Sequence, residues 1–315
     1  MQEFFDLPDA VRETGSTAAI VTVLFLVLFS IYEIVSGQTR NGKKSLKDWA
    51  MSGVSLGFLA TFQRPLLTVI VFLLMAALFP TYAGALTWLE AQHFWPTLIG
   101  FLLIDEYLHG RAHLFAHSRK PKSRLVGKVQ DFYKAAHRPH HLNGGQDERG
   151  EISASQTFVE NWAWWLILPN YWFGLACLYL GLYEVFLWGT VSKVIWGMHV
   201  HTNWKWQYDL WLLNHDNAMV RKCMRGLCHV FTFPNMHHHH HSRTANSTKN
   251  MTNFISVFDW LLWDTLKIET ERPKIYGWRQ YDAEAGSVMH RFLRTAAPVR
   301  ERRQPGDTAA IANQE

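Results

Sequence analysis

Five consecutive histidines lie inside the segment PNMHHHHHSR, which runs from Pro234 to Arg243. The run is internal and lies between apolar segments, so it is not a purification tag at a terminus. His237, His240 and His241 have the spacing H-x-x-H-H, and on a helix residues three and four apart share one face. Three imidazoles would then converge on one point, which predicts a ligand cluster.

Three further histidine groups precede this segment and share its short spacings. In DEYLHGRAHLFAH the histidines recur every four residues, which keeps them near one another on a helix face. FYKAAHRPHH repeats the spacing H-x-x-H-H, and GMHVHTN supplies a pair. The histidines of these three segments are His109, His113, His117, His137, His140, His141, His199 and His201.

So many imidazoles exceed what one metal ion binds. A structural zinc ion takes four ligands, and imidazole also suits copper, iron and nickel. The histidines therefore predict two metal ions. The residues alone do not identify the metal, but two redox-active irons with open positions would bind and activate dioxygen. An inert, apolar C–H bond requires such an oxidant.

Carboxylates near the histidines would offset the positive charge of two metal ions. Asp105 and Glu106 directly precede the first histidine group, and Asp259 follows the last. We expect each of them to orient a ligating histidine from outside the ligand set. The alternative, a charge at a helix end or at a membrane interface, stays open for each.

Long apolar stretches must position these groups. Ser16 to Ile31 carries no charge, and its extension to Gly37 gives enough helix to cross a bilayer, which needs about 20 residues. The loop from Thr39 to Lys47 is basic, and cytoplasmic loops of membrane proteins carry an excess of Lys and Arg. We therefore expect this loop in the cytoplasm and the N-terminus on the other side of the membrane. Met51 to Pro80 is the next apolar stretch, either a span broken at Pro65 or an interfacial helix followed by a span.

Three more crossings follow. An aromatic rim from Trp88 to Phe94 precedes a helix that re-enters the membrane and continues beyond it into Asp105 and the first histidine group. Asn161 to Leu180 and Leu182 to Met198 form a membrane hairpin. Five crossings put every histidine group on the cytoplasmic side. The predicted fold class is all-α, a multi-span helical membrane protein with a cytoplasmic histidine-rich helical cap.

The composition agrees with spans accompanied by a large polar part. The 315 residues are 48% hydrophobic, yet the mean hydropathy of -0.09 is low for an integral membrane protein. The net charge is +5, but the basic residues lie in short loops without interleaved aromatics, which argues against nucleic acid as a partner. Cys177, Cys223 and Cys228 form no zinc-like pairing and no even disulfide set, so the polar part should face a reducing compartment. We expect an integral protein of a bacterial inner membrane or the endoplasmic reticulum.

The remaining polar segments divide the chain. Ser118 to Lys128 is a basic loop, either simply solvated or a dock for an acidic electron-transfer partner or anionic lipid head groups. We expect a loop from Leu142 to Glu151 and a disordered tail from Ala297. The short amphipathic segment FISVFDWLLWDTL lies on the cytoplasmic surface or against the histidines. The resulting regions are an N-terminal transmembrane region (1–103), a histidine-rich core (104–275) that contains the hairpin (about 161–198), and a polar tail (276–315).

In their order, the histidine segments resemble the boxes of the fatty acid hydroxylase superfamily, which includes sterol desaturases and sterol 4-methyl oxidases. DEYLHGRAH is similar to the first box, with its leading Asp and Tyr, FYKAAHRPHH to the second, and PNMHHHHHSR to the third. HVHTN is similar to the histidine-containing segment between the second and third. The resemblance covers roughly Ile104 to Thr265, and three boxes in the right order are a specific signal.

The resemblance implies a membrane-embedded non-haem diiron oxygenase that uses dioxygen and two electrons to hydroxylate or desaturate a lipid, such as a fatty acyl chain or a sterol. It implies two iron ions, which zinc can replace during purification. A separate electron donor similar to cytochrome b5 or ferredoxin is needed, since the chain has no haem-binding pattern, no GxGxxG after a strand and no ferredoxin-like cysteine set. His117 and His199 are extra or outer ligands, and His238 and His239 match variable positions of the third box. The ligands that match the boxes are His109, His113, His137, His140, His141, His237, His240 and His241, with His201 as the further histidine.

Three features depart from the family pattern. Gly110 stands between His109 and Arg111, whereas the family usually has Arg directly after the leading His. The basic loop before the second box is longer than in the shortest members, and NFISVFDWLLWDT is only loosely similar to the usual ending after the third box. These differences leave the ligand set intact but do not assign the substrate subgroup.

A second class of function also fits the histidines, namely a divalent-metal transporter or metal-binding membrane protein. Its ligands would lie near the bilayer midplane, as functional charges inside membranes do. The histidine groups lie just outside the apolar stretches, which favours the oxygenase.

Overall fold

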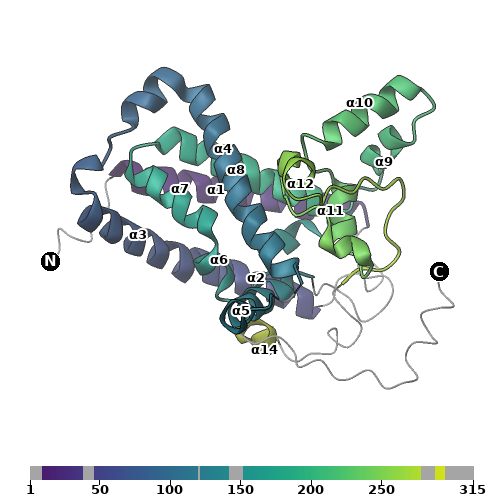
Figure 1. Ribbon diagram of the computed structural model, residues 1–315, viewed down its shortest axis with the longest axis horizontal. Helices are drawn as coiled ribbons and strands as arrows, with labels where there is room; N and C mark the ends of the chain where they lie inside the picture. The colour runs from purple at the N-terminus through teal and green to yellow at the C-terminus, as the bar shows by residue number, and fades with distance from the viewer. Residues whose placement is uncertain (1–8, 38–45, 120, 142–151, 278–287, 295–315) are drawn as a thin grey trace.

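The computed structural model describes residues 9–37, 46–119, 121–141, 152–277 and 288–294. Within these ranges the regular secondary structure is helical, and one isolated β-bridge joins Ser242 to Tyr276. The predicted all-α class is confirmed (Figure 1). Most of the basic loop from Thr39 to Lys47, the loop from Leu142 to Glu151 and the tail from Ala297 lie outside the described residues.

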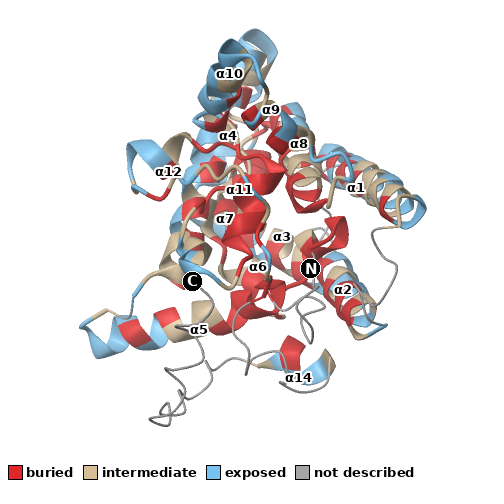
Figure 2. Cartoon of the chain, turned by 90° about the vertical axis from the view of Figure 1, so that its right-hand side faces the viewer, coloured by how far each residue is buried: buried red, intermediate tan, exposed pale blue. Residues whose placement is uncertain are grey.

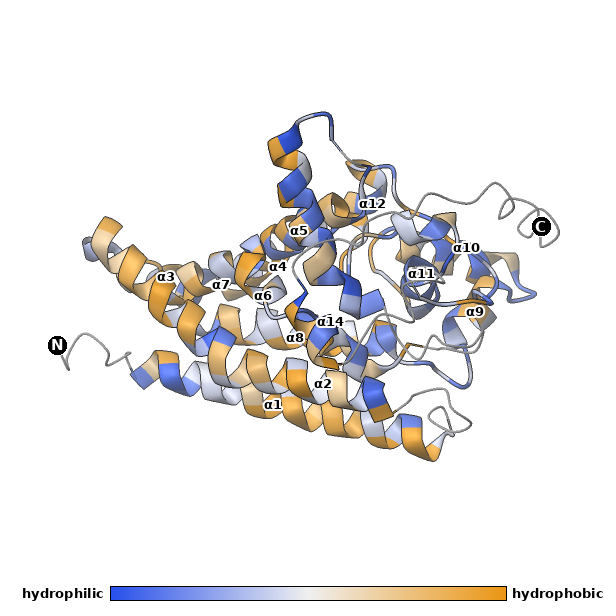
Figure 3. Cartoon of the chain, turned by 90° about the horizontal axis from the view of Figure 1, so that it is seen from below, coloured by the Kyte–Doolittle hydropathy of each residue, from blue (hydrophilic) through white to orange (hydrophobic). Residues whose placement is uncertain are grey.

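Two helices are long and apolar enough to cross a membrane. The first, α1 (Asp9–Val35), has 27 residues and is about 40 Å long. The second is continuous and consists of α2 (Leu46–Phe58), the π-helical turn η2 (Leu59–Gln63) and α3 (Arg64–Leu78). Both exceed the roughly 30 Å apolar thickness of a bilayer. Both helices are made largely of hydrophobic residues (Figure 3), and Ile20 of α1 is 69% exposed.

Pro65 lies within the second of these helices and changes its pitch locally. Proline lacks the N–H that an α-helix needs, and its ring clashes with the carbonyl one turn earlier. The chain before it widens into η2, in which the Arg64 N–H donates to the Leu59 carbonyl five residues back. The expected break at Pro65 is therefore a single π-helical turn inside one continuous helix.

After the 3-10 turn η3 (Pro80–Tyr82), α4 (Thr87–His117) carries the chain to the first histidine group. It is kinked at His93, close to Pro96, and its 31 residues span about 46 Å. The helix therefore continues well past Asp105, as predicted. Exposed apolar side chains recur every four residues along α4, at Trp95, Ile99, Leu103 and Tyr107.

A helical hairpin packs against α4. It consists of α7 (Pro169–Tyr179) and α8 (Tyr183–His201), and is preceded by the 3-10 turn η4 (Ala154–Phe158) and α6 (Trp164–Ile167). α8 contacts both α1 and α4. The predicted hairpin is thus present, but its first arm is split, and the 11 residues of α7 cover only about 16 Å. The described residues contain two helices able to cross a membrane by length and composition, so five crossings stay a prediction.

Shorter helices surround the histidines. The basic segment from Ser118 to Lys128 is not a loop throughout, because α5 begins at Arg124. The predicted amphipathic segment after the last histidines contains α12, and the ring of Phe258 lies 5.6 Å from that of Tyr107 on α4. Figure 2 shows burial concentrated along the centre of the molecule, around α11. These helices are α5 (Arg124–His141), α9 (Tyr208–Leu213), α10 (Ala218–Cys228), α11 (Pro234–His240), the 3-10 turn η5 (Ala245–Thr248), α12 (Val257–Leu261) and α14 (Val288–Leu293).

Candidate metal centre

Two groups of histidines converge where α4, α5, α8 and α11 meet. In each group, one imidazole nitrogen from every residue lies within 4.8 Å of the others, so each group could hold a metal ion. Nine of the eleven predicted ligands belong to the two groups. Group one is His113, His117, His137, His141 and His240, and group two is His140, His201, His237 and His241.

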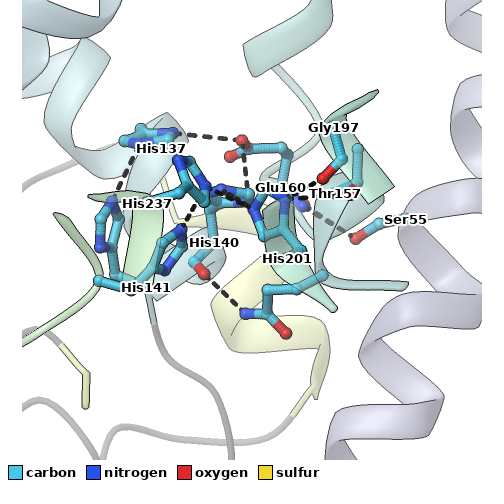
Figure 4. Close-up of polar contacts among 11 residues, drawn as sticks. Ser55, His137, His140, His141, Thr157, Glu160, Gly197, His201 and His237 are labelled. Carbon is cyan, nitrogen blue, oxygen red and sulfur yellow. Dashed lines mark hydrogen bonds and ion pairs between the residues drawn. The ribbon is translucent and has the colours of Figure 1, made fainter. Parts of the chain in front are cut away.

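The H-x-x-H-H spacing explains why the two groups adjoin. The last turn of α5 carries one copy, and α11 with the residue after it carries the other. Each copy contributes to both groups: α5 gives two imidazoles to group one and one to group two, and α11 does the reverse. His141 of group one and His241 of group two stack with ring centroids 4.4 Å apart. The two helices therefore hold the groups side by side, and Figure 4 shows part of each: His137 and His141 of group one, and His140, His201 and His237 of group two.

The distances between ring nitrogens fit metal coordination. A metal–nitrogen bond of about 2.1 Å puts two ligands at right angles about 3.0 Å apart. A neutral imidazole nitrogen is either a donor or an acceptor, so an unbroken series of such contacts is poorly satisfied by hydrogen bonds alone. A cation that faces all the lone pairs satisfies it. Neighbouring Nε2 atoms lie 2.9 to 3.1 Å apart in the pairs His137–His141, His140–His201, His201–His237 and His237–His241.

Hydrogen bonds on the outer nitrogen turn the other nitrogen of two imidazoles inward. His113 Nδ1 donates to the Met251 carbonyl at 2.7 Å, and His240 Nδ1 donates to the Lys249 carbonyl at 3.0 Å. A carbonyl only accepts, so each Nδ1 carries the proton and each Nε2 keeps its lone pair. Both Nε2 atoms are buried without a hydrogen-bond partner, which is rare in folded proteins. A histidine that binds a metal through one ring nitrogen usually donates a hydrogen bond from the other, as these two would.

A buried carboxylate that was not among the sequence-based candidates, Glu160, contacts both groups. Its Oε1 lies 3.2 Å from His137 Nδ1 in group one and 3.5 Å from His140 Nδ1 in group two (Figure 4). Ser55 of α2 holds the backbone here, with its hydroxyl donating to the Glu160 carbonyl at 2.9 Å. Burial raises the pKa of the Glu160 carboxyl, and a nearby metal cation would favour its charged form. The one signal in the sequence is a single acidic residue before an apolar stretch.

The segment around η4 braces group two. The Gln156 amide donates to the His140 carbonyl at 2.6 Å, and the Thr157 hydroxyl lies 3.2 Å from His201 Nδ1. η4 is itself anchored by α1, because the carboxylate of Glu33 accepts a hydrogen bond from the first residue of η4 at 2.8 Å. Through Glu33, α1 therefore holds the segment that contacts His140 and His201 of group two.

Two of the three predicted carboxylates orient His113 through the backbone. Asp259 accepts hydrogen bonds from the N–H groups of Met251 and Thr252 at 2.7 and 3.1 Å. Glu106 accepts from the next two N–H groups at 2.5 and 2.8 Å. These bonds fix the loop whose Met251 carbonyl accepts from His113. Asp259 and Glu106 therefore act on His113 through the backbone of this loop, from outside the histidine groups.

The third, Asp105, pairs with Lys193 of α8. Lys193 also lies 3.0 Å from Glu106, and all three side chains are buried. Lys193, a charge within the predicted hairpin, is therefore neutralised inside the protein. The three charges tie α4 to α8 one turn before His109 on α4.

Two predicted ligands lie outside the groups. His109 stacks beside His113 on α4, with ring centroids 5.7 Å apart. His199 Nε2 makes a 2.7 Å hydrogen bond with the Tyr208 hydroxyl. His109 is therefore a neighbour of group one, and His199 has a partner of its own.

The two middle histidines of the run of five also lie outside the groups. His238 Nδ1 lies 2.9 Å from the Tyr276 hydroxyl, and His239 Nε2 donates to the Glu271 carbonyl at 2.7 Å. The helix thus divides the five histidines: His237, His240 and His241 belong to the groups, and the two between them contact the segment after α12.

Gly110, which departs from the family pattern, makes room for an aromatic ring. A Cβ at this position would lie 2.5 and 2.6 Å from two atoms of the Trp263 ring. Contacts of that length do not occur between packed side chains. Trp263, in the loop after α12, therefore packs directly on α4 because residue 110 has no side chain.

The groups are enclosed, and their imidazoles are neutral. Eight of the nine are buried, and His117 is half-buried. Burial lowers the pKa of His113 to about 4 and that of His201 to about 4. Neutral imidazole is the form that binds metals, so nine inward nitrogens of this kind fit two transition-metal cations.

Comparisons of the chain with protein-family models, with curated proteins and with solved structures found no match. The chain itself has two histidine groups that could each hold a metal ion, and two helices long and apolar enough to cross a membrane.

Proposed function

We propose that the chain is a membrane-bound non-haem diiron oxygenase that uses dioxygen and two electrons to hydroxylate or desaturate a lipid. The observation that carries the proposal is the pair of adjoining all-histidine groups. The resemblance of four histidine segments to the fatty acid hydroxylase superfamily supports this chemistry for the pair.

The number of histidines in group one favours iron over structural zinc. A structural zinc ion sits in a closed set of four ligands. Group one offers five imidazoles, with His109 beside them, which suits a six-coordinate metal that keeps a position open. Imidazole binds iron as well as zinc. A bound pair of irons would supply the activation of dioxygen that oxidation of an apolar C–H bond requires.

The residues around the groups have three roles in this proposal. The carbonyls of Met251 and Lys249 keep the protons of His113 and His240 on the outer nitrogens. Glu160, which contacts an imidazole of each group, offsets part of the metal charge. Burial of the imidazoles excludes water, which protects a strong oxidant from side reactions.

The outer surface of α4 supports a lipid substrate. Its exposed apolar stripe ends at Tyr107, and the rise of a helix places His113 only about 9 Å further along the axis. The Tyr107 ring also lies 6.0 Å from that of Trp263, which packs over Gly110. A bilayer against this stripe would bring acyl chains within two helical turns of group one.

Anaerobic metal analysis combined with lipid-product profiling tests the proposal. Wild type, His240→Ala and His239→Ala would be expressed in the same cells. We expect wild type to contain iron, to consume dioxygen with a reductant and to form a hydroxylated or desaturated lipid, and His240→Ala to form none. His239→Ala is the matched control, because its ring lies outside both groups.

Two results would contradict the proposal. One is a lipid profile that is the same in cells expressing wild type and His240→Ala, together with no dioxygen consumption by the iron-loaded wild type. The other is His240-dependent movement of zinc or another divalent ion across vesicles, which would favour the transporter.

A further inference from the structure

The first half of α5 is an exposed amphipathic helix. Leu125 is 73% exposed, Val126 41% and Val129 45%, whereas the second half of α5 is buried and carries His137. Figure 3 shows α5 standing out from the molecule, across the direction of α1. Three neighbouring aliphatic side chains on a projecting helix need a cover, because apolar surface in water is unfavourable.

The same stretch is strongly basic. Arg119, Lys122, Arg124 and Lys128 are all exposed. The one acidic residue of α5 is Asp131, seven residues after Arg124 and three after Lys128. Four cations therefore surround the exposed aliphatic side chains, and this surface should attract an anionic partner.

The exposed surface of α4 points to the nature of that partner. Its apolar stripe from Trp95 ends at Tyr107, and one turn later Arg111 is exposed. A change from exposed apolar to exposed basic side chains marks the boundary between acyl chains and head groups. α5 begins seven residues after α4 ends, so its cations follow Arg111 in the chain, beyond the apolar stripe.

An anionic lipid surface fits both features of α5 better than an acidic protein does. Helices that lie in a membrane interface combine aliphatic side chains, which enter the acyl boundary, with Lys and Arg, which contact the head groups. An acidic protein would account for the cations but would leave Leu125, Val126 and Val129 unexplained.

We propose that the first half of α5 is an interfacial helix that binds the head groups of anionic phospholipids, with its three aliphatic side chains in the acyl boundary. The inference rests on the membrane location in the proposed function. It adds a lipid contact to the helix whose other end carries three histidines of the metal centre, so the membrane surface would fix the position of α5.

Fluorescence quenching in nanodiscs tests this contact with the full chain. A fluorophore would be placed on Val126→Cys in a Cys223→Ser background, since Cys223 is exposed and the other two cysteines are buried. The nanodiscs would contain brominated phosphatidylcholine, alone or mixed with brominated phosphatidylglycerol. We expect stronger quenching with phosphatidylglycerol, and less of that difference at high salt.

Charge reversal supplies the decisive comparison. Each basic side chain near an anionic membrane favours binding about five-fold, so Arg124→Glu with Lys128→Glu should weaken the preference for phosphatidylglycerol at least about 25-fold. Quenching should then no longer differ between the two lipid mixtures. Lys222→Glu with Arg225→Glu in α10 makes the same change in charge and should leave the difference intact.

Three outcomes would overturn the inference. They are an unquenched probe in both lipids, quenching that is equal in both, and shielding that appears only on adding an acidic ferredoxin or at high concentration of the chain itself. The metal content of the same samples separates this result from the proposed function, because the reversed residues lie about 14 Å or more along α5 from His137. Unchanged iron with unchanged quenching would reject the lipid contact alone.

Discussion

Replacing Glu160 with Ala tests the support of both histidine groups with one change. The substitution removes the acceptor 3.2 Å from His137 Nδ1 and the carboxylate oxygen 3.5 Å from His140 Nδ1. His137 would lose its hydrogen-bond acceptor, and His140 in the other group would lose the carboxylate beside it. Glu160→Gln keeps an oxygen acceptor of the same size but removes the charge.

The size of the effect follows from these contacts. Loss of an outer partner of a metal-binding histidine typically weakens metal binding by about 10 to 100-fold, which corresponds to about 1.4 to 2.7 kcal/mol. The buried His137 N–H would also lose its acceptor, at a cost of about 1 to 3 kcal/mol in folding free energy. We expect Glu160→Gln to weaken metal binding less than Glu160→Ala, because it keeps the hydrogen bond.

Competition with a chelator of known affinity would measure metal binding by both groups. Glu90→Ala is the matched control, since Glu90 accepts a hydrogen bond from the Val185 N–H away from the histidines. A Glu160→Ala protein that is folded and binds metal as tightly as wild type would refute the role of Glu160. Equal losses in Glu160→Gln and Glu160→Ala would show that charge, and not the hydrogen bond, is what matters.

Three further predictions address the ligands and their supports. His201→Ala should remove about one metal ion per chain, whereas His199→Ala should keep both, because only His201 belongs to a group; metal analysis distinguishes them, and equal losses would contradict the grouping. Gly110→Ala should destabilise the fold by about 1 to 3 kcal/mol, because its Cβ would overlap the Trp263 ring. In the double variant, Trp263→Leu should offset part of that loss. Denaturant unfolding of both single variants and the double variant measures this coupling, and purely additive losses of unfolding free energy would contradict the contact between residues 110 and 263. Lys193→Met should lower the free energy of unfolding by about 3 to 5 kcal/mol, because it leaves the buried carboxylates of Asp105 and Glu106 without their cation. Lys205→Met, at an exposed position, should change it little, and similar melting temperatures for the two variants would contradict a role for the buried ion pairs.

Which histidines come together was largely predictable because it depends on local spacing. H-x-x-H-H at a helix end fixes which imidazoles share a face, so the helix itself divides the run of five into members of the two groups and their neighbours. The same holds for His113 and His117, four residues apart on α4. Residues that lie near one another in the chain need no knowledge of the tertiary fold.

Supports from distant parts of the chain were not predictable in this way. Glu160 follows η4, and it lies beside the histidines because η4 packs against α5. Glu33 of α1 in turn accepts a hydrogen bond from η4. Asp259 acts through the Met251 carbonyl, which no spacing in the sequence indicates. His109 has the right helical phase but lies one turn too far along α4 to join group one. Each of these outcomes depends on contacts between helices.

Counting metal ions per chain is the most direct test of a paired metal centre. The protein would be purified anaerobically, loaded with ferrous iron, freed of excess metal and analysed for iron and zinc together with protein concentration. Two separate histidine groups predict about two metal ions per chain, and His240→Ala should retain the ion of group two. A folded wild-type chain that binds one ion or none would contradict a paired metal centre, and with it the proposed oxygenase.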